Sequence, residues 1–269
     1  MARRSVSALN AISRMIPGRL IPLVRMVELG SAALQGKGWG TATIHEEVDL
    51  AISLLPPRDA IVIDAGANRG DWSRAILNRA GPRLEKLFAF EPSRAHAEAL
   101  DDIRDARFEW LQSGLGEHPG ESTLYAVESG IGSASVFKRR LDHMNVSISF
   151  EEPIHLLTLD QFAEDRGLER IDFVKLDVEG NELNVLAGAT RLLSTRAVRA
   201  LSFEFGGCNI DARVFFQDLW YLLRQHGYRV FRAAPPSRLL PVVEYTEDLE
   251  CFRTSNYFAV ASDHEFTRR

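Results

Sequence analysis

The sequence has few cysteines, no long apolar run and no excess of basic residues, and each shortage excludes a class of protein. Its 269 residues include only Cys208 and Cys251, without a CxxC pair or a His/Cys cluster, so neither a disulfide scaffold nor a thiolate zinc site is expected. No run of about 18 or more apolar residues occurs, which argues against a membrane-spanning helix. The net charge of −5 disfavours a nucleic-acid binder. We therefore expect a protein of a reducing compartment, the cytoplasm.

Positive charge is concentrated at the N-terminus. Residues 1–40 hold six basic side chains and one acidic side chain, whereas the rest of the chain holds 26 basic and 36 acidic ones. The spacing of the apolar residues predicts a helical extension over 1–40, interrupted near Pro17-Gly18 and Pro22. Two interpretations stay open: an arm packed on the catalytic domain, or a basic helix that makes peripheral contact with a membrane. The Arg-rich, acid-poor composition also leaves a transit peptide as a third.

Residues 41–269 alternate between strand and helix patterns. Strands are expected at 60–63, 86–90, 108–112, 171–176, 199–205, 228–233 and 257–261, with a short extra one at 122–127. Helices are expected at 44–55, 72–79, 94–104, 182–193 and 215–226. This alternation predicts a single α/β domain: a Rossmann-like, seven-stranded, mostly parallel sheet with helices on both faces. Residues 129–153 and 233–256 break the rhythm, and we expect the first of these to be a substrate-side insertion.

A glycine-bearing turn, Asp64-Ala65-Gly66-Ala67-Asn68-Arg69-Gly70, follows the first expected strand and begins a helix. In doubly wound sheets ligands bind beyond the carboxyl ends of the strands, and glycines let the backbone approach them closely. The helix start also favours a negative group. The spacing is G-x-x-x-G rather than G-x-G-x-x-G, which disfavours a pyrophosphate cofactor.

Polar residues end the next two strands as well. Glu91, followed by Pro92, comes at the tip of the second strand, where a carboxylate can accept hydrogen bonds from ribose hydroxyls. Its alternative role is to support the dipole of the following helix. The third strand ends at Ser113-Gly114, which would border a base but also suits an ordinary turn.

The strand expected at 171–176 ends in a charged segment, Lys175-Leu176-Asp177-Val178-Glu179. Because strand side chains alternate, Lys175, Asp177 and Glu179 are predicted to share one face. Lys175 would neutralise a neighbouring acid, while Asp177 or Glu179 would act as general base or metal ligand for an acceptor hydroxyl. Two further candidate bases are Glu204, which lies in the neighbouring strand, and His155.

These segments together resemble the FkbM family of methyltransferases. The resemblance covers roughly residues 45–260 and rests on Asp64–Gly70, Phe90-Glu91-Pro92, His155–Asp160, Lys175–Glu182 and Val185–Ala189. It implies a Rossmann-like seven-stranded fold, S-adenosylmethionine as cofactor and, usually, O-methylation of sugars or secondary metabolites. It does not extend to residues 1–40, and residues 130–150 match no motif of the family.

By position, the resemblance implies that Asp64, Gly66, Asn68 and Gly70 line the methionine end of the cofactor and that Glu91 holds the ribose. Asp177 and Glu179 would lie at the transfer site. The full predicted cofactor-binding set is Asp64, Gly66, Ala67, Asn68, Gly70, Glu91, Pro92, Ser113, Gly114 and Asp177. The predicted catalytic candidates are Asp177, Glu179, Glu204 and His155; the first three are also candidate ligands of a divalent cation.

Three other functions share parts of this pattern. A nicotinamide-dependent oxidoreductase has a similar fold and ribose carboxylate but requires the tighter glycine fingerprint. An α/β-hydrolase requires a G-x-S-x-G turn, and Gly130–Ser135 lacks that spacing. A non-catalytic nucleoside-binding module would keep cofactor binding without turnover. We therefore expect a methyltransferase whose acceptor is a hydroxyl of a small molecule, sugar, glycan or glycolipid. The sequence does not indicate the oligomeric state.

Overall fold

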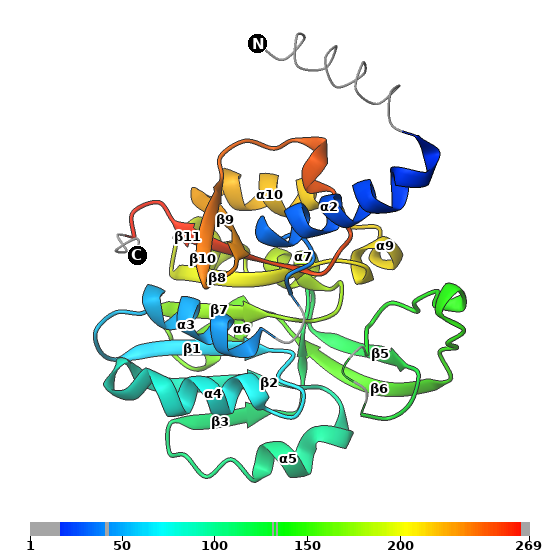
Figure 1. The fold of residues 1–269 in the computed structure, drawn as a ribbon. Helices are drawn as coiled ribbons and strands as arrows, with labels where there is room; N and C mark the ends of the chain where they lie inside the picture. Colours follow the sequence, from blue (N-terminus) through cyan, green and yellow to red (C-terminus); the bar gives the residue numbers. More distant parts are fainter. Residues whose placement is uncertain (1–16, 41–42, 131, 133, 265–269) are drawn as a thin grey trace.

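Eight strands form the central sheet of the computed structural model (Figure 1), which describes residues 17–40, 43–130, 132 and 134–264. Their order across the sheet is β10-β9-β11-β8-β7-β1-β2-β3. The bounds are β1 (Ala60–Ala65), β2 (Leu84–Phe90), β3 (Phe108–Leu111), β7 (Ile171–Leu176), β8 (Val198–Phe205), β9 (Tyr228–Ala234), β10 (Arg238–Val242) and β11 (Ser255–Ala261). Strands β3, β2, β1, β7 and β8 pair in parallel, while β11 is antiparallel to both of its neighbours. The order reverses between β1 and β7, where ligands bind in such sheets.

The expected mostly parallel α/β sheet is confirmed, but it contains eight strands rather than seven. The additional strand is β10, which forms a hairpin with β9 inside the segment expected to be irregular. This strand has five residues, carries Pro241 and lies at the edge of the sheet. Because an edge position tolerates a residue without a backbone N–H, β10 can form despite a pattern that reads as loop.

A second sheet of three strands lies beyond the carboxyl ends of β1 and β2 (Figure 1). It consists of β4 (Gly114–Leu115), β6 (Phe150–Leu157) and β5 (Gly120–Ala126) in that order. The segment 129–153, expected to be an irregular insertion, contains the 3-10 turn η4 (Asp142–Met144), and its last residues belong to β6. A bridge between Tyr125 and Ser135 ties this segment back to β5.

Helices cover both faces of the large sheet. On one face lie α3 (Ile44–Leu54) and α4 (Asp71–Ala80); on the other lie α6 (Leu159–Asp165), α7 (Glu182–Ala187), α8 (Thr190–Ser194) and α10 (Phe216–Gln225). Alternation along β1 builds both cores, because Val62 packs with the first pair of helices and Ile63 with the second group. The remaining short elements are η2 (Gly81–Arg83), η3 (Arg94–His96), α5 (Ala97–Asp101), α9 (Cys208–Ala212) and η5 (Glu247–Leu249).

The single helix expected over 182–193 is instead two, α7 and α8, separated at Gly188 and Ala189. A Cβ at Gly188 would lie 2.1 Å from the carbonyl oxygen of Gly116. The chain therefore bends where α7 passes the second sheet closely, a tertiary contact that helical periodicity does not reveal.

At the N-terminal side, η1 (Gly18–Leu20) leads into α2 (Ile21–Leu34). Pro22 does not interrupt this helix, because a proline in the first turn costs no hydrogen bond. The first half of the expected extension, residues 1–16, lies outside the described residues. None of the described helices has both the length and the apolar character needed to cross a membrane.

Candidate active site

Two adjoining cavities lie where the carboxyl ends of β1, β2 and β7 meet. The first has a volume of about 690 Å³ and the second a volume of about 1240 Å³, both including space open to solvent. Gly66, Glu91 and Asp177, which the sequence predicts to converge, all line the first cavity. Gly66 and Asp177 line the second as well. The tips of three neighbouring strands thus share one hollow region.

Gly66 forms the turn that brings β1 against β7. Its φ is +80°, and a Cβ here would lie 1.8 Å from the carbonyl oxygen of Asp177, so only glycine fits. The backbone N–H groups of Gly66 and Ala67 both donate to the carbonyl oxygen of Phe90, at 2.9 and 3.0 Å. Gly70 acts elsewhere: it is the N-cap of α4 and packs against Ile103, away from both cavity walls.

Glu91 is held by two backbone donors. Its Oε2 accepts from the N–H of Asn68 at 2.7 Å, and its Oε1 accepts from the N–H of Ser93 at 2.9 Å. The residue is only 7% exposed, and this burial raises the pKa of its carboxyl to about 7 despite both hydrogen bonds. Each carboxylate oxygen can accept more than one hydrogen bond, so the group keeps acceptor capacity on the cavity side.

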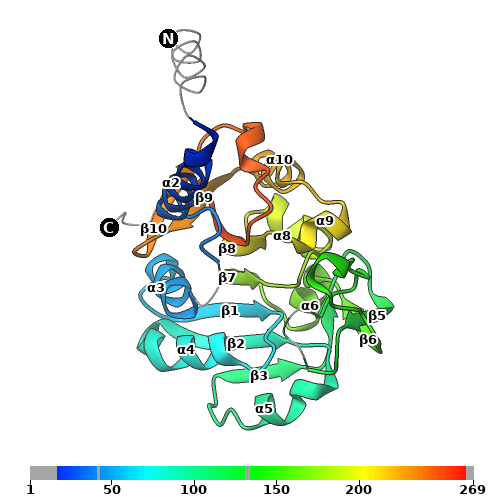
Figure 2. The same ribbon diagram turned by 45° about the vertical axis from the view of Figure 1, so that its right-hand side comes forward.

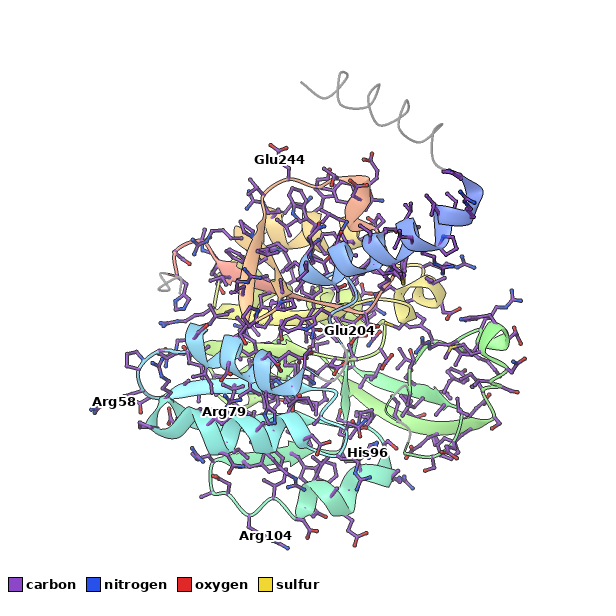
Figure 3. The ribbon with its side chains drawn as sticks, in the orientation of Figure 1. Arg58, Arg79, His96, Arg104, Glu204 and Glu244 are labelled. Atoms are coloured by element: carbon purple, nitrogen blue, oxygen red, sulfur yellow. The ribbon has the colours of Figure 1, made fainter. Side chains whose placement is uncertain are left out.

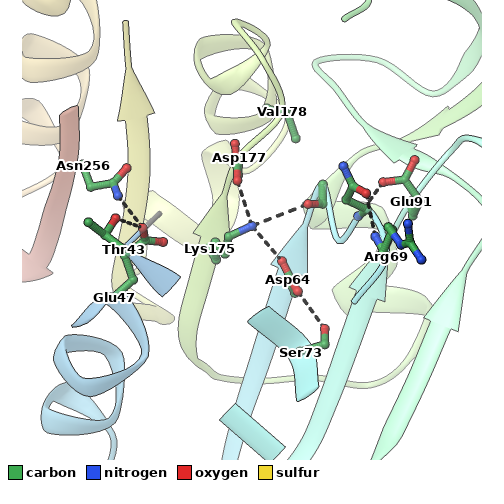
Figure 4. A network of polar contacts seen from close by, with 12 residues as sticks. Thr43, Glu47, Asp64, Arg69, Ser73, Glu91, Lys175, Asp177, Val178 and Asn256 are labelled. Atoms are coloured by element: carbon green, nitrogen blue, oxygen red, sulfur yellow. Dashed lines mark hydrogen bonds and ion pairs between the residues drawn. The ribbon is translucent and has the colours of Figure 1, made fainter. Parts of the chain in front are cut away.

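Lys175 links the carboxyl ends of β1 and β7 through two ion pairs (Figure 4). Its ammonium lies 3.2 Å from Asp64 Oδ1 and 3.2 Å from Asp177 Oδ2. Burial opposes the charge, but the two carboxylates raise the pKa of Lys175 above its usual value. Asp64 also accepts from the hydroxyl of Ser73 at 2.7 Å and has no exposed surface. Asp64 therefore lies behind the cavity walls, whereas Lys175 and Asp177 form part of them.

Acidic groups gather in the second cavity. Glu179, Glu204 and Cys208 each offer a ligand atom within 4.8 Å of the others, a grouping found among the described residues. Burial, followed by the charge of Asp177, raises the pKa of Glu204 to about 9 and that of Glu179 to about 8. Of the three predicted metal ligands, Asp177 lies outside this grouping and pairs with Lys175 instead. Cys208, which sequence reasoning did not select, lies within it.

Side-chain alternation predicts that Glu179 shares a strand face with Lys175 and Asp177, but Glu179 lies outside strand β7. The strand ends at Leu176, and Glu179 sits in a following turn with a φ of +52°. The hydroxyl of Ser135 donates to its carbonyl oxygen at 2.7 Å, and the guanidinium of Arg139 lies 3.2 Å from its Oε2. Arg139 also lies 3.9 Å from Asp211. The segment after β5 is thereby tied across the second cavity.

The basic run Lys138-Arg139-Arg140 is split by this arrangement. The side chains of Lys138 and Arg140 are 61% and 86% exposed, but that of Arg139 is 15% exposed and lines the second cavity. The sequence contains no signal that separates Arg139 from its neighbours, since the distinction depends on where Glu179 and Asp211 come to lie.

The remaining predicted residues occupy different places. Pro92 and Gly114 line the first cavity, and Ala67 lines the second. Ser113 is buried beside them, with its hydroxyl 3.1 Å from the carbonyl oxygens of Gly114 and His155. His155 itself is exposed on β6 and lines neither cavity. Side-chain alternation along this strand explains the position, because Ile154 and Leu156 face the first cavity and His155 points away. The structure does not bring His155 to the other candidate bases.

His96 is a cavity residue that sequence reasoning missed. It lies after β2, is 5% exposed and lines the first cavity opposite the apolar side chains of the second sheet, Leu124, Ile154 and Leu156. Burial, and then the charge of Arg69, lowers the pKa of its imidazole. Figure 3 shows His96 and Glu204 inside the molecule, while the labelled Arg58, Arg104 and Glu244 lie at its periphery. The first cavity thus combines an apolar wall with a neutral ring and a carboxyl group.

Comparisons with known proteins identify similar methyltransferase sequences. A family model described as the methyltransferase FkbM domain matches residues 64–230. The chain is 32% identical over 211 residues to the AMB antimetabolite synthetase AmbE of Pseudomonas aeruginosa, a match that covers 66% of this chain and 10% of that protein. It is 28% identical over 163 residues to the 2-O-methyltransferase NoeI of Sinorhizobium fredii, covering 56% of this chain and 65% of that protein.

A solved structure is also similar in fold. The methyltransferase FkbM of Methylobacillus flagellatus is 19% identical and has a TM-score of 0.46, and the match covers 74% of this chain and 43% of that chain. In each of these matches the chain spans less than two thirds of the length of the protein it resembles.

Proposed function

The chain belongs to the FkbM methyltransferase family, and from this premise we propose that it is an S-adenosylmethionine-dependent O-methyltransferase. The acceptor that we propose is a hydroxyl of a small molecule, sugar, glycan or glycolipid. The observation that carries the proposal is that Gly66, Glu91 and Asp177 line one cavity, which opens onto a second cavity rich in acids.

The first cavity suits an adenosine group. Glu91 offers acceptor capacity to two ribose hydroxyls, while its backbone donors fix its orientation. Leu124, Ile154 and Leu156 supply an apolar wall for a base. Gly66 lines both cavities, and the carbonyl oxygen of Asp177 occupies the place that a Cβ would take. Because the walls provide both kinds of contact, the residues present fit this cofactor.

The second cavity suits the methionine portion and the acceptor. Asn68 and Arg69 line it just before α4, and the cationic side chain of Arg69 favours a carboxylate. Arg69 is exposed, and no ion pair ties its guanidinium to another described residue. Lys175 fixes the carboxylate of Asp177 on the wall shared by both cavities. These residues would orient the donor against a hydroxyl held beside Glu179 and Glu204.

S-adenosylmethionine supplies a methyl group on a sulfonium centre, and the protein's task is to position an oxygen nucleophile and remove its proton. Glu179 and Glu204 are the candidate bases, since their raised pKa values of about 8 and about 9 are close to those that make a carboxylate an effective proton acceptor near neutral pH. Asp177 would hold the reacting groups in line. Residues 129–153, tied to Glu179 through Ser135, would form the acceptor side.

The similarity to a protein named as a 2-O-methyltransferase supports transfer to oxygen. The acid-rich second cavity also supports it, because an alcohol is a weak nucleophile whose proton a base must remove. Three proposed parts thus act together: Glu91 binds the ribose, Asp177 positions the reacting groups, and Glu179 or Glu204 accepts the proton.

Calorimetric titration with S-adenosylhomocysteine and, separately, with NAD⁺ tests the cofactor. We expect binding of the first only, and binding of NAD⁺ alone would favour the nicotinamide-dependent alternative. A labelled-methyl assay over hydroxylated glycans, glycolipids and small natural products then tests the reaction. We expect methyl transfer to an oxygen atom. The variant Asp177→Asn should reduce the rate of this transfer and leave the affinity for S-adenosylhomocysteine unchanged. Cofactor binding with no transfer to any acceptor would favour a nucleoside-binding module.

A further inference from the structure

Helix α2 presents an apolar surface to solvent. Within the described part of the chain, 13 large apolar side chains are exposed, and eight of them lie between Leu20 and Leu34. Met26, Val27 and Leu34 are 64%, 63% and 69% exposed. Burying a side chain of this size stabilises by about 1.5–3 kcal/mol, so leaving this many in water indicates a surface that is covered in use.

The apolar surface faces away from the body of the protein. A helix turns by about 100° per residue, so Leu23, Met26, Val27 and Leu34 fall within about 100° of arc. Ala32, the buried residue of α2, lies on the opposite side. Figures 1 and 2 agree that α2 lies beside β9, with its N-terminal end leading away from the sheet. The apolar arc is therefore directed away from Ala32, the buried residue of this helix, while residues 21–31 are exposed.

The end of α2 is fixed firmly to the large sheet. The guanidinium of Arg232 donates to the carbonyl oxygen of Gln35 at 2.7 Å, and the N–H of Gly38 donates to the hydroxyl of Ser255 at 2.9 Å. A Cβ at Gly36 would lie 1.9 Å from the carbonyl oxygen of Ala233, so the chain passes directly against β9. Glu28 lies 3.6 Å from Arg253. These contacts hold the apolar arc in a defined orientation.

The charge around this surface points to its occupant. Residues 1–40 hold six basic side chains and one acidic side chain, Glu28, which Arg253 already neutralises. Arg19 and Arg25 are exposed and form no ion pair within the described residues. An isologous contact between two copies would bring identical basic segments to both sides of the interface. An anionic surface instead complements them.

We propose that α2 docks this protein on an anionic phospholipid bilayer. The apolar arc would enter the boundary between headgroups and acyl chains, while the net positive charge of residues 1–40 attracts the anionic headgroups. The helix lies in the membrane surface and does not span it. This inference does not depend on the reaction proposed above, so its test uses no cofactor or acceptor.

Co-sedimentation of the full chain with vesicles tests the docking surface. We compare vesicles of phosphatidylcholine alone with vesicles that contain phosphatidylglycerol as well, at low and at high salt. We expect the protein to bind the vesicles that contain phosphatidylglycerol at low salt. Binding should be at least tenfold weaker to vesicles of phosphatidylcholine alone, and at least tenfold weaker to the anionic vesicles at high salt. Equal binding to both vesicle types, or binding to neither, would overturn the proposal.

Variants separate the apolar and the charged contributions. Val27→Asp should weaken vesicle binding at least tenfold, whereas Val243→Asp, at a residue 68% exposed in another part of the structure, should leave it unchanged. In the double variant Arg19→Glu/Arg25→Glu, each substitution should weaken binding to the anionic vesicles about fivefold or more, since a basic residue near such a surface contributes about 1 kcal/mol. Equal binding by the two aspartate variants contradicts the proposal. So does light scattering that shows a dimer which Val27→Asp dissociates, since the surface would then bind a second copy.

Discussion

The ammonium of Lys175 lies 3.2 Å from Oδ1 of Asp64, a carboxylate with no exposed surface. The same ammonium lies 3.2 Å from Asp177 at the cavity wall. Asp64 therefore reaches the site through Lys175 rather than by contact with a ligand. An acid that ends the first strand of this fold can thus determine the position of another acid on the neighbouring strand.

Replacing Asp64 by alanine should destabilise the fold strongly. The change leaves Lys175 buried with one of its two carboxylate partners removed, and breaking a buried ion pair costs about 3–5 kcal/mol. Ser73→Ala, which removes only the hydroxyl donor to Asp64, should cost about 1 kcal/mol. Urea unfolding of both variants measures the difference. If Asp64→Ala kept full stability and lost only its affinity for S-adenosylhomocysteine, Asp64 would act by direct contact instead.

Glu91→Ala should weaken binding of S-adenosylhomocysteine by about 10- to 100-fold. A hydrogen bond to a charged group is worth about 1.5–3 kcal/mol, and the variant removes the acceptor for ribose. Glu85→Ala is the matched control, because Glu85 lies on the same strand with an exposed side chain. Titration calorimetry measures both affinities, and thermal unfolding checks that both proteins fold. Unchanged affinity in Glu91→Ala would remove Glu91 from the cofactor site.

Much of the sheet could be predicted because its strands are buried and its helices amphipathic. The run Ala60–Ile63 reads as a buried strand, and the structure extends it to Ala65. Strand β10 could not be found, since an edge strand with Pro241 has the composition of a loop. The division of α7 from α8 depends on a contact between Gly188 and Gly116, which are remote in sequence.

Some residues of the candidate site could likewise be predicted from the sequence, and others could not. Gly66, Glu91 and Asp177 follow strands that the pattern identifies, so their meeting could be inferred from topology. The positions of His96 and Arg139 depend on loops that carry no periodic signal. His155 was selected for its chemistry alone, and one step of alternation along β6 sends it to the opposite face. A residue type can be read from a sequence more readily than the direction of its side chain.

Glu182 should make the protein less stable as pH rises. Its Oε1 accepts from the N–H groups of Val178 and Gly180, but its Oε2 is buried without a hydrogen-bond partner among the described residues. Burial raises its pKa from 4.5 to about 7. The folded protein thus binds this proton more tightly than the unfolded chain, so the stability it contributes is full below about pH 4.5 and is lost as pH rises through about 7.

Glu182→Gln keeps an oxygen for both backbone donors and removes the ionisation. We expect its midpoint of thermal unfolding to exceed that of the wild type by about 2 °C or more at pH 8, since each kcal/mol shifts the midpoint by about 2–4 °C in a protein of this size. At pH 5 the two midpoints should agree more closely. Glu164→Gln, at an exposed position, is the control. A gap of the same size at both pH values would show that ionisation of Glu182 does not affect stability.

The rate of methyl transfer should rise with pH up to about pH 8 or 9. Glu179 and Glu204 hold their protons at neutral pH, because burial and the charge of Asp177 raise their pKa values to about 8 and about 9. A carboxyl group must lose its proton before it can accept one from the acceptor hydroxyl. Below the controlling pKa, kcat should therefore increase about tenfold per pH unit.

The variant Glu204→Gln decides which of the two acids controls the rise of kcat with pH. If Glu204 is the base, the variant should lose about 10²–10⁴-fold in kcat at pH 9, the contribution typical of general base catalysis, and its rate should no longer follow pH. Glu244→Gln, at an exposed glutamate, should behave as the wild type (Figure 3). If kcat of Glu204→Gln still rises with pH, with a midpoint near pH 8, Glu179 is the base, because its own carboxyl still titrates there. A flat wild-type profile between pH 6 and 9 would exclude both, since neither carboxyl could then limit the transfer.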